Sequence, residues 1–144
     1  MGLGVYPATH KRFLGMLGMH GTYQANMSMH NADLIIAIGA RFDDRITNTP
    51  KLFAPNAKII HLDVDYSSVS KIIEANIAVF GQVKNSLLEM IKLLEAKKEL
   101  IDPKKILPWK EQILDWKSQH GLNHEMHLCE TDDKPIMPQA VVQH

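Results

Sequence analysis

Glycines and carboxylates follow three short apolar runs in this 144-residue sequence. Gly39 ends the run DLIIAIG, Asp63 and Asp65 end KIIHLDVD, and Gly81 follows IAVF. Glycine lets a ligand approach the backbone closely, and a carboxylate about 20 residues after a strand-end glycine can accept hydrogen bonds from ribose hydroxyls. The complete G-x-G-x-x-G pattern is absent. The spacing therefore leaves two interpretations open, a nucleotide site or plain turn glycines with surface acids.

The segment GARFDDR, which leaves the first apolar run, favours the nucleotide interpretation. Arg41 and Arg45 flank Asp43 and Asp44. A guanidinium can bind phosphate or carboxylate through two parallel hydrogen bonds, and a neighbouring aspartate can hold it in place. The alternative is a surface ion-pair cluster, which is worth at most about 1 kcal/mol per pair. The position directly after a predicted strand favours a binding function.

The stretch LGMLGMHGTYQANMSMH, residues 14–30, is rich in glycine, methionine and histidine. His20 could act as a general base, but no nucleophile or carboxylate stands beside it at a triad-like spacing, so a packed or hydrogen-bonded histidine is favoured. Methionine suits the wall of a flat hydrophobic ligand, as well as core filling. The residues alone leave both interpretations of Met19 open, whereas Met27 and Met29, later in the stretch, are expected in the core.

Two polar features near the C-terminus carry weaker predictions. His120, His124 and His127 lie close together, but they lack the H-E-x-x-H spacing of a zinc site on a helix, so no metal site is predicted. Cys129 is the single cysteine, which excludes an internal disulfide and a multi-cysteine zinc cluster. We interpret it as a free thiol.

A parallel sheet would bring the strand-end residues together. Continuous apolar runs are typical of strands buried on both faces, and strands that alternate with helical patterns indicate a doubly wound α/β fold. Thr22 is the expected N-cap of the first helix, and residues 1–21 read as loop with at most a short helix at 13–17. The predicted strands span 33–39, 58–65 and 77–80, and the predicted helices span 22–32, 67–75, 82–98 and 109–120.

Composition narrows the class of protein. The sequence is 45% hydrophobic and 22% charged, which is typical of a soluble globular protein. Sixteen basic and sixteen acidic residues give no net charge, so nothing draws the chain to nucleic acid or to an anionic membrane. There is no apolar run of about 18 residues and no signal-peptide pattern at the N-terminus. We expect a cytoplasmic protein.

The motifs GLGVYP, MLGMHG, NADLIIAIGARFDDRIT and IIHLDVD resemble the large, catalytic subunits of acetolactate synthase, also called acetohydroxyacid synthase. This family of thiamine-diphosphate enzymes condenses two pyruvates, or pyruvate with 2-oxobutyrate, with loss of CO2 in branched-chain amino-acid biosynthesis. The resemblance implies a central FAD-binding α/β domain, truncated at its N-terminus, whose flavin does no net redox work. It also implies a homo-oligomer, with a regulatory subunit as a further partner.

The resemblance also implies roles for individual residues. Met19 and Arg45 match positions near the second 2-oxo acid, and Arg45 suits a carboxylate substrate. The catalytic carboxylate and the binding sites for thiamine diphosphate and Mg2+ belong to other domains, so this chain is expected to be inactive alone. The positions that match flavin contacts are Leu17, Gly18, Met19, His20, Gly39, Ala40, Arg41, Asp43, Arg45, Asp63, Val64 and Gly81.

The sequence departs from the family at Gln82, where an aspartate usually follows the glycine, and this puts one polar contact to the adenosine end of FAD in doubt. KPIMPQAVV near the C-terminus resembles the start of the diphosphate-binding domain. We therefore expect residues 1–98 to be a partial flavin-binding domain and 99–144 to be a helical linker that enters the next domain. Two alternatives remain, another thiamine-diphosphate carboligase or decarboxylase and a stand-alone nucleotide-binding module.

Overall fold

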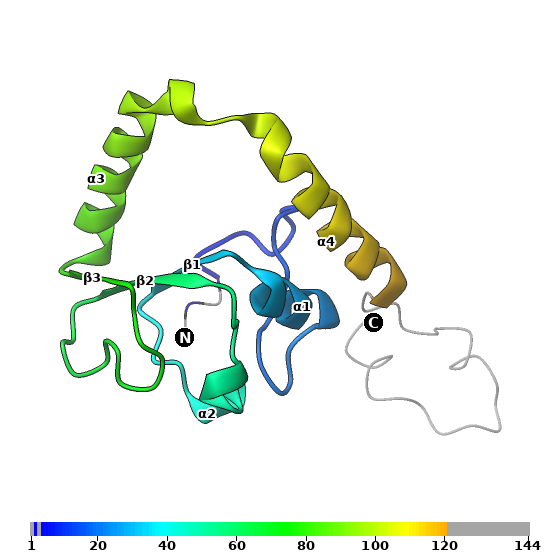
Figure 1. The fold of residues 1–144 in the computed structure, drawn as a ribbon, viewed down its shortest axis with the longest axis horizontal. Coiled ribbons are helices and arrows are strands. Elements are labelled where there is room, and N and C mark those ends of the chain that lie inside the picture. Colours follow the sequence, from blue (N-terminus) through cyan, green and yellow to red (C-terminus); the bar gives the residue numbers. More distant parts are fainter. Residues whose placement is uncertain (1, 3, 121–144) are drawn as a thin grey trace.

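The computed structural model describes residues 2 and 4–120 of the chain. A three-stranded parallel sheet forms the centre of this part (Figure 1). Ile38, Leu62 and Val79 lie side by side across the sheet. The predicted α/β class with a parallel sheet and flanking helices is therefore confirmed. The strands, in hydrogen-bonded order, are β1 (Leu34–Ile38), β2 (Lys58–Asp63) and β3 (Ile77–Phe80).

Helix α1 (Tyr23–Asn31) packs on one face of this sheet. Thr22 caps it as expected, because its hydroxyl accepts a hydrogen bond from the backbone N–H of Ala25. Met29 and Ala32 pack against the buried core. The loop after β1 leads into a single-turn helix, α2 (Asp44–Thr47), and a 3-10 turn, η1 (Pro50–Leu52).

The two faces of β1 differ in burial. Ile35 and Ala37 are buried, whereas Leu34, Ile36 and Ile38 remain 49%, 43% and 44% exposed. The expectation that this strand is buried on both faces is wrong for the described residues. Helix α1 covers only one face, and α3 packs mainly against β2.

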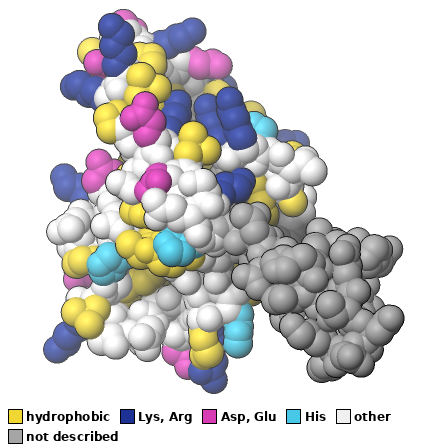
Figure 2. All heavy atoms as spheres, turned by 90° about the vertical axis from the view of Figure 1, so that its right-hand side faces the viewer, with side chains coloured by type: hydrophobic (Ala, Val, Ile, Leu, Met, Phe, Trp, Pro, Cys, Tyr) yellow, Lys and Arg dark blue, Asp and Glu magenta, His cyan; other side chains and the backbone are white. Residues whose placement is uncertain are grey.

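Two long helices follow β3, of which the first leads away from the sheet and the second returns toward α1 (Figure 1). Helix α3 (Val83–Ala96) confirms the predicted amphipathic helix, but the second half of its apolar stripe, including Leu94, is exposed. Turns η2 (Lys98–Leu100) and η3 (Pro103–Ile106) lead to α4 (Leu107–His120), which packs on α1. Figure 2 shows the hydrophobic side chains left exposed between charged ones on one face. No helix in the described part of the chain is long and apolar enough to span a membrane.

The helix predicted over residues 67–75 does not form. The segment is a series of turns, in which the Ser70 hydroxyl accepts a hydrogen bond from the backbone N–H of Ala75 in place of a helical carbonyl. Ser70 has a φ of 56°, which is incompatible with a continuing right-handed helix. No helix forms at residues 13–17 either.

Candidate functional site

The ends of the three strands form one row, which we call the strand-end row: Gly39, Asp63 and Gly81. The backbone N–H of Gly39 donates to the carbonyl of Leu62 (2.9 Å), and that of Gly81 donates to the carbonyl of Asp63 (3.1 Å). Gly39 has a φ of 60°, and a Cβ added there would meet no atom within 4 Å. The sheet therefore brings the predicted strand-end residues together and leaves open space beside Gly39.

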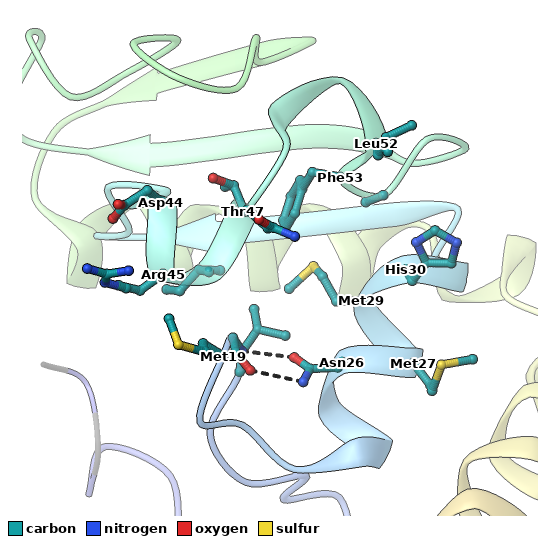
Figure 3. A pocket seen from close by; sticks show the side chains of 15 residues that line it. Met19, Asn26, Met27, Met29, His30, Asp44, Arg45, Thr47, Leu52 and Phe53 are labelled. Atoms are coloured by element: carbon teal, nitrogen blue, oxygen red, sulfur yellow. Dashed lines mark hydrogen bonds between the residues drawn. The ribbon is translucent and has the colours of Figure 1, made fainter.

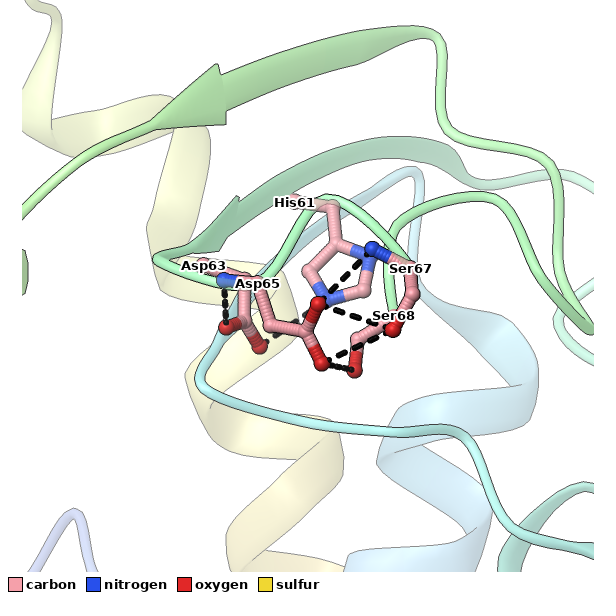
Figure 4. A network of polar contacts seen from close by, with 5 residues as sticks. All are labelled: His61, Asp63, Asp65, Ser67 and Ser68. Carbon is pink, nitrogen blue, oxygen red and sulfur yellow. Dashed lines mark hydrogen bonds and ion pairs between the residues drawn. The ribbon is translucent and has the colours of Figure 1, made fainter.

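Two groups lie next to the carboxylate of Asp63 (Figure 4). Its Oδ1 accepts a hydrogen bond from the backbone N–H of Asp65 at 2.9 Å. Its Oδ2 lies 4.0 Å from Nε2 of His61, which is fully buried and has no hydrogen-bond partner on either ring nitrogen. The side chain of Asp63 is 12% exposed, so one carboxylate oxygen remains available at the edge of the sheet without a full hydrogen bond.

Asp65 organises the turn after β2. Its carboxylate accepts hydrogen bonds from the hydroxyl and backbone N–H of Ser67 and from the hydroxyl of Ser68. These contacts, with the Ser67 hydroxyl foremost, hold the pKa of Asp65 below its ordinary value of 3.8. Asp65 is therefore a turn residue, and Asp63 alone of this pair points to the candidate site.

A second group of predicted residues forms the clamped loop, residues 17–19 together with Arg45. The backbone N–H of Met19 donates to the carbonyl of Arg45 at 2.8 Å. The amide of Asn26 both accepts from the N–H of Gly18 (2.8 Å) and donates to its carbonyl (3.0 Å). Gly18 has a φ of 102°, and an added Cβ would lie 2.5 Å from the Arg45 carbonyl oxygen. This position therefore requires glycine.

The clamped loop lines a pocket of about 630 Å³ between α1 and α2 (Figure 3). Met19 and Arg45 lie at one end of it, and His30 and Leu52 lie at the other. Met19 is 61% exposed, so its thioether is accessible to a ligand. The pocket is lined by Leu17, Gly18, Met19, Asn26, Met27, Met29, His30, Asp44, Arg45, Ile46, Thr47, Asn48, Leu52, Phe53 and Ala54.

The loop GARFDDR is anchored by Phe42, which is buried and packs edge-to-face against the ring of His61 at 5.2 Å. Nη2 of Arg41 lies 3.3 Å from Oδ2 of Asp43, and both side chains are at least half exposed. Within the described residues Arg45 makes no ion pair, so its guanidinium is available at the pocket. The predicted aspartate support therefore exists for Arg41 but not for Arg45.

The other predicted residues lie outside this pocket's lining. His20 and Val64 are exposed, and Ala40 packs against the core. The core assignment is confirmed for Met29, which packs on the core and also lines the pocket, and is corrected for Met27, which lines the pocket.

The sequence did not predict a role for Asn26 or His61, nor for His30 and Leu52 at the end of the pocket opposite Met19. An amide one turn into a helix whose N-terminus follows a glycine-rich loop is a signal that could have found Asn26. For His30 and Leu52 the sequence holds no comparable signal, because their role depends on how η1 folds back toward α1.

The model of the thiamine pyrophosphate enzyme central domain matches residues 1–90 of this chain. The chain belongs to this family of thiamine pyrophosphate enzyme central domains. The match covers the sheet, the strand-end row and the clamped loop, so both parts of the candidate site lie within the family domain. Helix α4 lies beyond the matched residues.

The chain is also similar to acetolactate synthase large subunits. It is 45% identical over 143 residues to the large subunit of isozyme 3 from Escherichia coli K12, which covers 99% of this chain and 24% of that protein. It is 56% identical over 94 residues to the large subunit from Haemophilus influenzae, covering 65% of this chain and 16% of the relative. The probable large subunit from Methanocaldococcus jannaschii is 40% identical over 143 residues, 99% of this chain and 23% of the relative. The chain thus spans about a quarter or less of these proteins.

Within this central domain, the described residues include no group of three or more His, Cys, Asp or Glu side chains placed to hold a metal ion. His124, His127, Cys129 and the segment KPIMPQAVV lie outside the described residues. The candidate site therefore offers the Arg45 guanidinium, the Met19 thioether, the Asp44 carboxylate and the His30 imidazole at the pocket, and the Asp63 carboxylate at the strand ends.

Proposed function

We propose that this chain is the FAD-binding central part of an acetolactate synthase, which condenses two pyruvates, or pyruvate with 2-oxobutyrate, with loss of CO2. Residues 1–98 form the flavin-binding domain, and residues 99–144 connect it to the thiamine-diphosphate-binding domain. The observation that carries the proposal is the hydrogen bond between Met19 and Arg45, which fixes two family-matched residues in the wall of one pocket.

The geometry of the strand-end row fits a flavin nucleotide. The open space at Gly39 permits close approach of a ligand to the backbone, and Oδ2 of Asp63 is available to accept a hydrogen bond from a ribose hydroxyl. Arg41 offers an exposed guanidinium on the loop between this row and the pocket, and a guanidinium suits a diphosphate. These features support an extended dinucleotide whose adenosine end lies at Asp63.

The clamped loop suits the flavin end of the same ligand. Met19 offers a polarisable, exposed surface to a flat ring, and Leu17 adds apolar wall. Arg45, unpaired within the described residues, is placed to orient the carboxylate of the acceptor 2-oxo acid. His20 and Ala40 are proposed as further flavin contacts on the family match alone.

The chain would bind FAD and orient the acceptor 2-oxo acid, and it would contribute no catalytic residue. Thiamine diphosphate and Mg2+, held by other domains of the full-length enzyme, supply the carbon–carbon bond chemistry. The relatives are named large subunits, which supports a smaller, regulatory subunit as a partner. A homo-oligomer and a cytoplasmic location are proposed on the family resemblance alone. We expect the 144-residue chain to form no acetolactate from pyruvate, thiamine diphosphate and Mg2+, and a colorimetric acetolactate assay that detects product contradicts this.

The cofactor assignment is tested by titrating the purified chain and its variants with FAD. Asp63→Asn and Arg41→Ala should each weaken FAD binding about tenfold or more, because each removes a charge-assisted contact worth about 1.5–3 kcal/mol. Asp33→Asn is the matched control, since Asp33 is an exposed aspartate before β1, at the opposite end of the sheet. Equal affinities for wild type and both site variants would overturn the assignment.

A further inference from the structure

Two aromatic rings stack on the surface beside the strand-end row. The centroids of Tyr66 and Phe80 are 4.1 Å apart, and their planes are inclined by only 16°. Tyr66 is 73% exposed and Phe80 is 41% exposed. The separation leaves no space for a third ring between them, but the outer face of Tyr66 is open. The pair therefore presents a flat apolar surface, and exposed aromatic surfaces commonly mark binding sites.

The register of the sheet places this surface next to Asp63. Phe80 is the cross-strand partner of Asp63 in the β2–β3 pair, and partners in a pleated sheet point to the same face. The hydrogen bond from Gly81 to the Asp63 carbonyl closes the same edge. A carboxylate with one available oxygen thus stands beside an open aromatic face.

This combination matches the chemistry of adenosine. An adenine ring is flat and stacks on aromatic side chains, and such stacking is worth about 1–3 kcal/mol per base. The attached ribose carries hydroxyls that can donate hydrogen bonds to a carboxylate at a strand end. A flavin mononucleotide has neither the adenine nor its ribose, so it would gain nothing from this surface.

We propose that Tyr66, supported by Phe80, is the stacking platform for the adenine ring of the bound nucleotide. The inference rests on the proposed FAD site and adds a specificity determinant to it: the strand-end row selects adenine nucleotides over flavin mononucleotide. It also gives the adenosine end of the ligand an apolar contact where Gln82 replaces the usual aspartate of the family.

The test compares the affinities of the chain for FAD, ADP and FMN, measured by isothermal titration calorimetry. Tyr66→Ala should weaken FAD and ADP about tenfold, equivalent to about 1.4 kcal/mol, and should leave FMN within about twofold. Tyr66→Phe retains the ring and should bind all three ligands as wild type does. Tyr6→Ala removes another exposed tyrosine, which pairs with His10, and serves as the matched control. Tyr66→Ser provides a second truncation if the alanine variant does not fold.

The outcomes separate this inference from the proposed function. If wild type binds FAD and the Tyr66 truncation binds FAD and ADP with unchanged affinity, the adenine platform is wrong and the FAD site stands. If the truncation weakens FMN as much as FAD, the ring has only a structural role, and the platform is again wrong. If wild type binds neither FAD nor ADP, the proposed FAD site fails and the platform fails with it.

Discussion

The two parts of the candidate site are built by different means. The strand-end row is positioned by regular sheet hydrogen bonds, and its Gly39 borders open space. The clamped loop has no regular structure and is fixed by single contacts, the Asn26 amide to Gly18 and the Arg45 carbonyl to Met19. A site built on a sheet should tolerate local change, whereas one held by a few irregular contacts should lose its shape when any of them is removed.

Replacing one glycine by alanine in each part should give the largest difference between them. Gly18→Ala should lower the free energy of unfolding by about 3 kcal/mol, because it adds strain at positive φ and a clash with the Arg45 carbonyl. Gly39→Ala adds only the strain and should cost about 1 kcal/mol. Urea unfolding followed by circular dichroism measures both. Equal losses would mean that the loop is not clamped.

Asn26→Ala tests the clamp without altering the backbone. Removing the amide leaves the N–H and carbonyl of the buried Gly18 without these partners, so we expect a loss of about 1.5 kcal/mol in the free energy of unfolding and a weaker flavin site. Asn31→Ala is the control, because its one hydrogen bond, to the Met27 carbonyl, is exposed. If the two variants unfold at the same urea concentration, the amide contributes nothing to the loop.

Arg41→Ala should change the stability by less than about 0.5 kcal/mol, because the ion pair with Asp43 is exposed and screened by solvent. Its effect should appear in FAD affinity instead. A variant that unfolds more easily but binds FAD as wild type does would show that Arg41 is a structural residue.

The smallest effect concerns the turn after the strand-end row. Ser67→Ala removes the foremost contact that lowers the pKa of Asp65, so that pKa should rise toward 3.8 in an NMR titration. A lowered native pKa adds stability above the unfolded-state pKa of about 4, and this stability is lost as the pH falls through the lowered value. Wild type should therefore be the more stable protein at neutral pH, and the difference should vanish in acid. An unchanged Asp65 titration would contradict the hydrogen-bond network of the turn.

Much of the fold could be predicted from sequence because apolar runs and helical periodicity are local signals. All three strands, α1 with its Thr22 cap, and α3 follow from them. The missed turns over residues 67–75 reflect the left-handed backbone of Ser70 and the hydrogen bond that its hydroxyl accepts from Ala75, which periodicity does not register. The sequence also did not predict that only one face of β1 is buried, because an apolar run does not indicate which helices cover each face of the strand.

The candidate site divides in the same way. The strand-end row was predictable, because parallel strands bring their carboxyl ends to one edge. The pairing of Met19 with Arg45 and the stacking of Tyr66 on Phe80 depend on contacts between segments distant in sequence. No residue pattern within one segment encodes such contacts.

A single FAD-binding site that reaches from the clamped loop to Asp63 can be tested by equilibrium titration of the 144-residue chain with FAD, followed by flavin fluorescence and then by displacement with ADP. We expect saturable, equimolar binding and its reversal by excess ADP, because the adenosine end of FAD and ADP would share the strand-end row. A fluorescence signal that never saturates, or saturable binding that ADP leaves untouched, would contradict a site that extends from the clamped loop to Asp63.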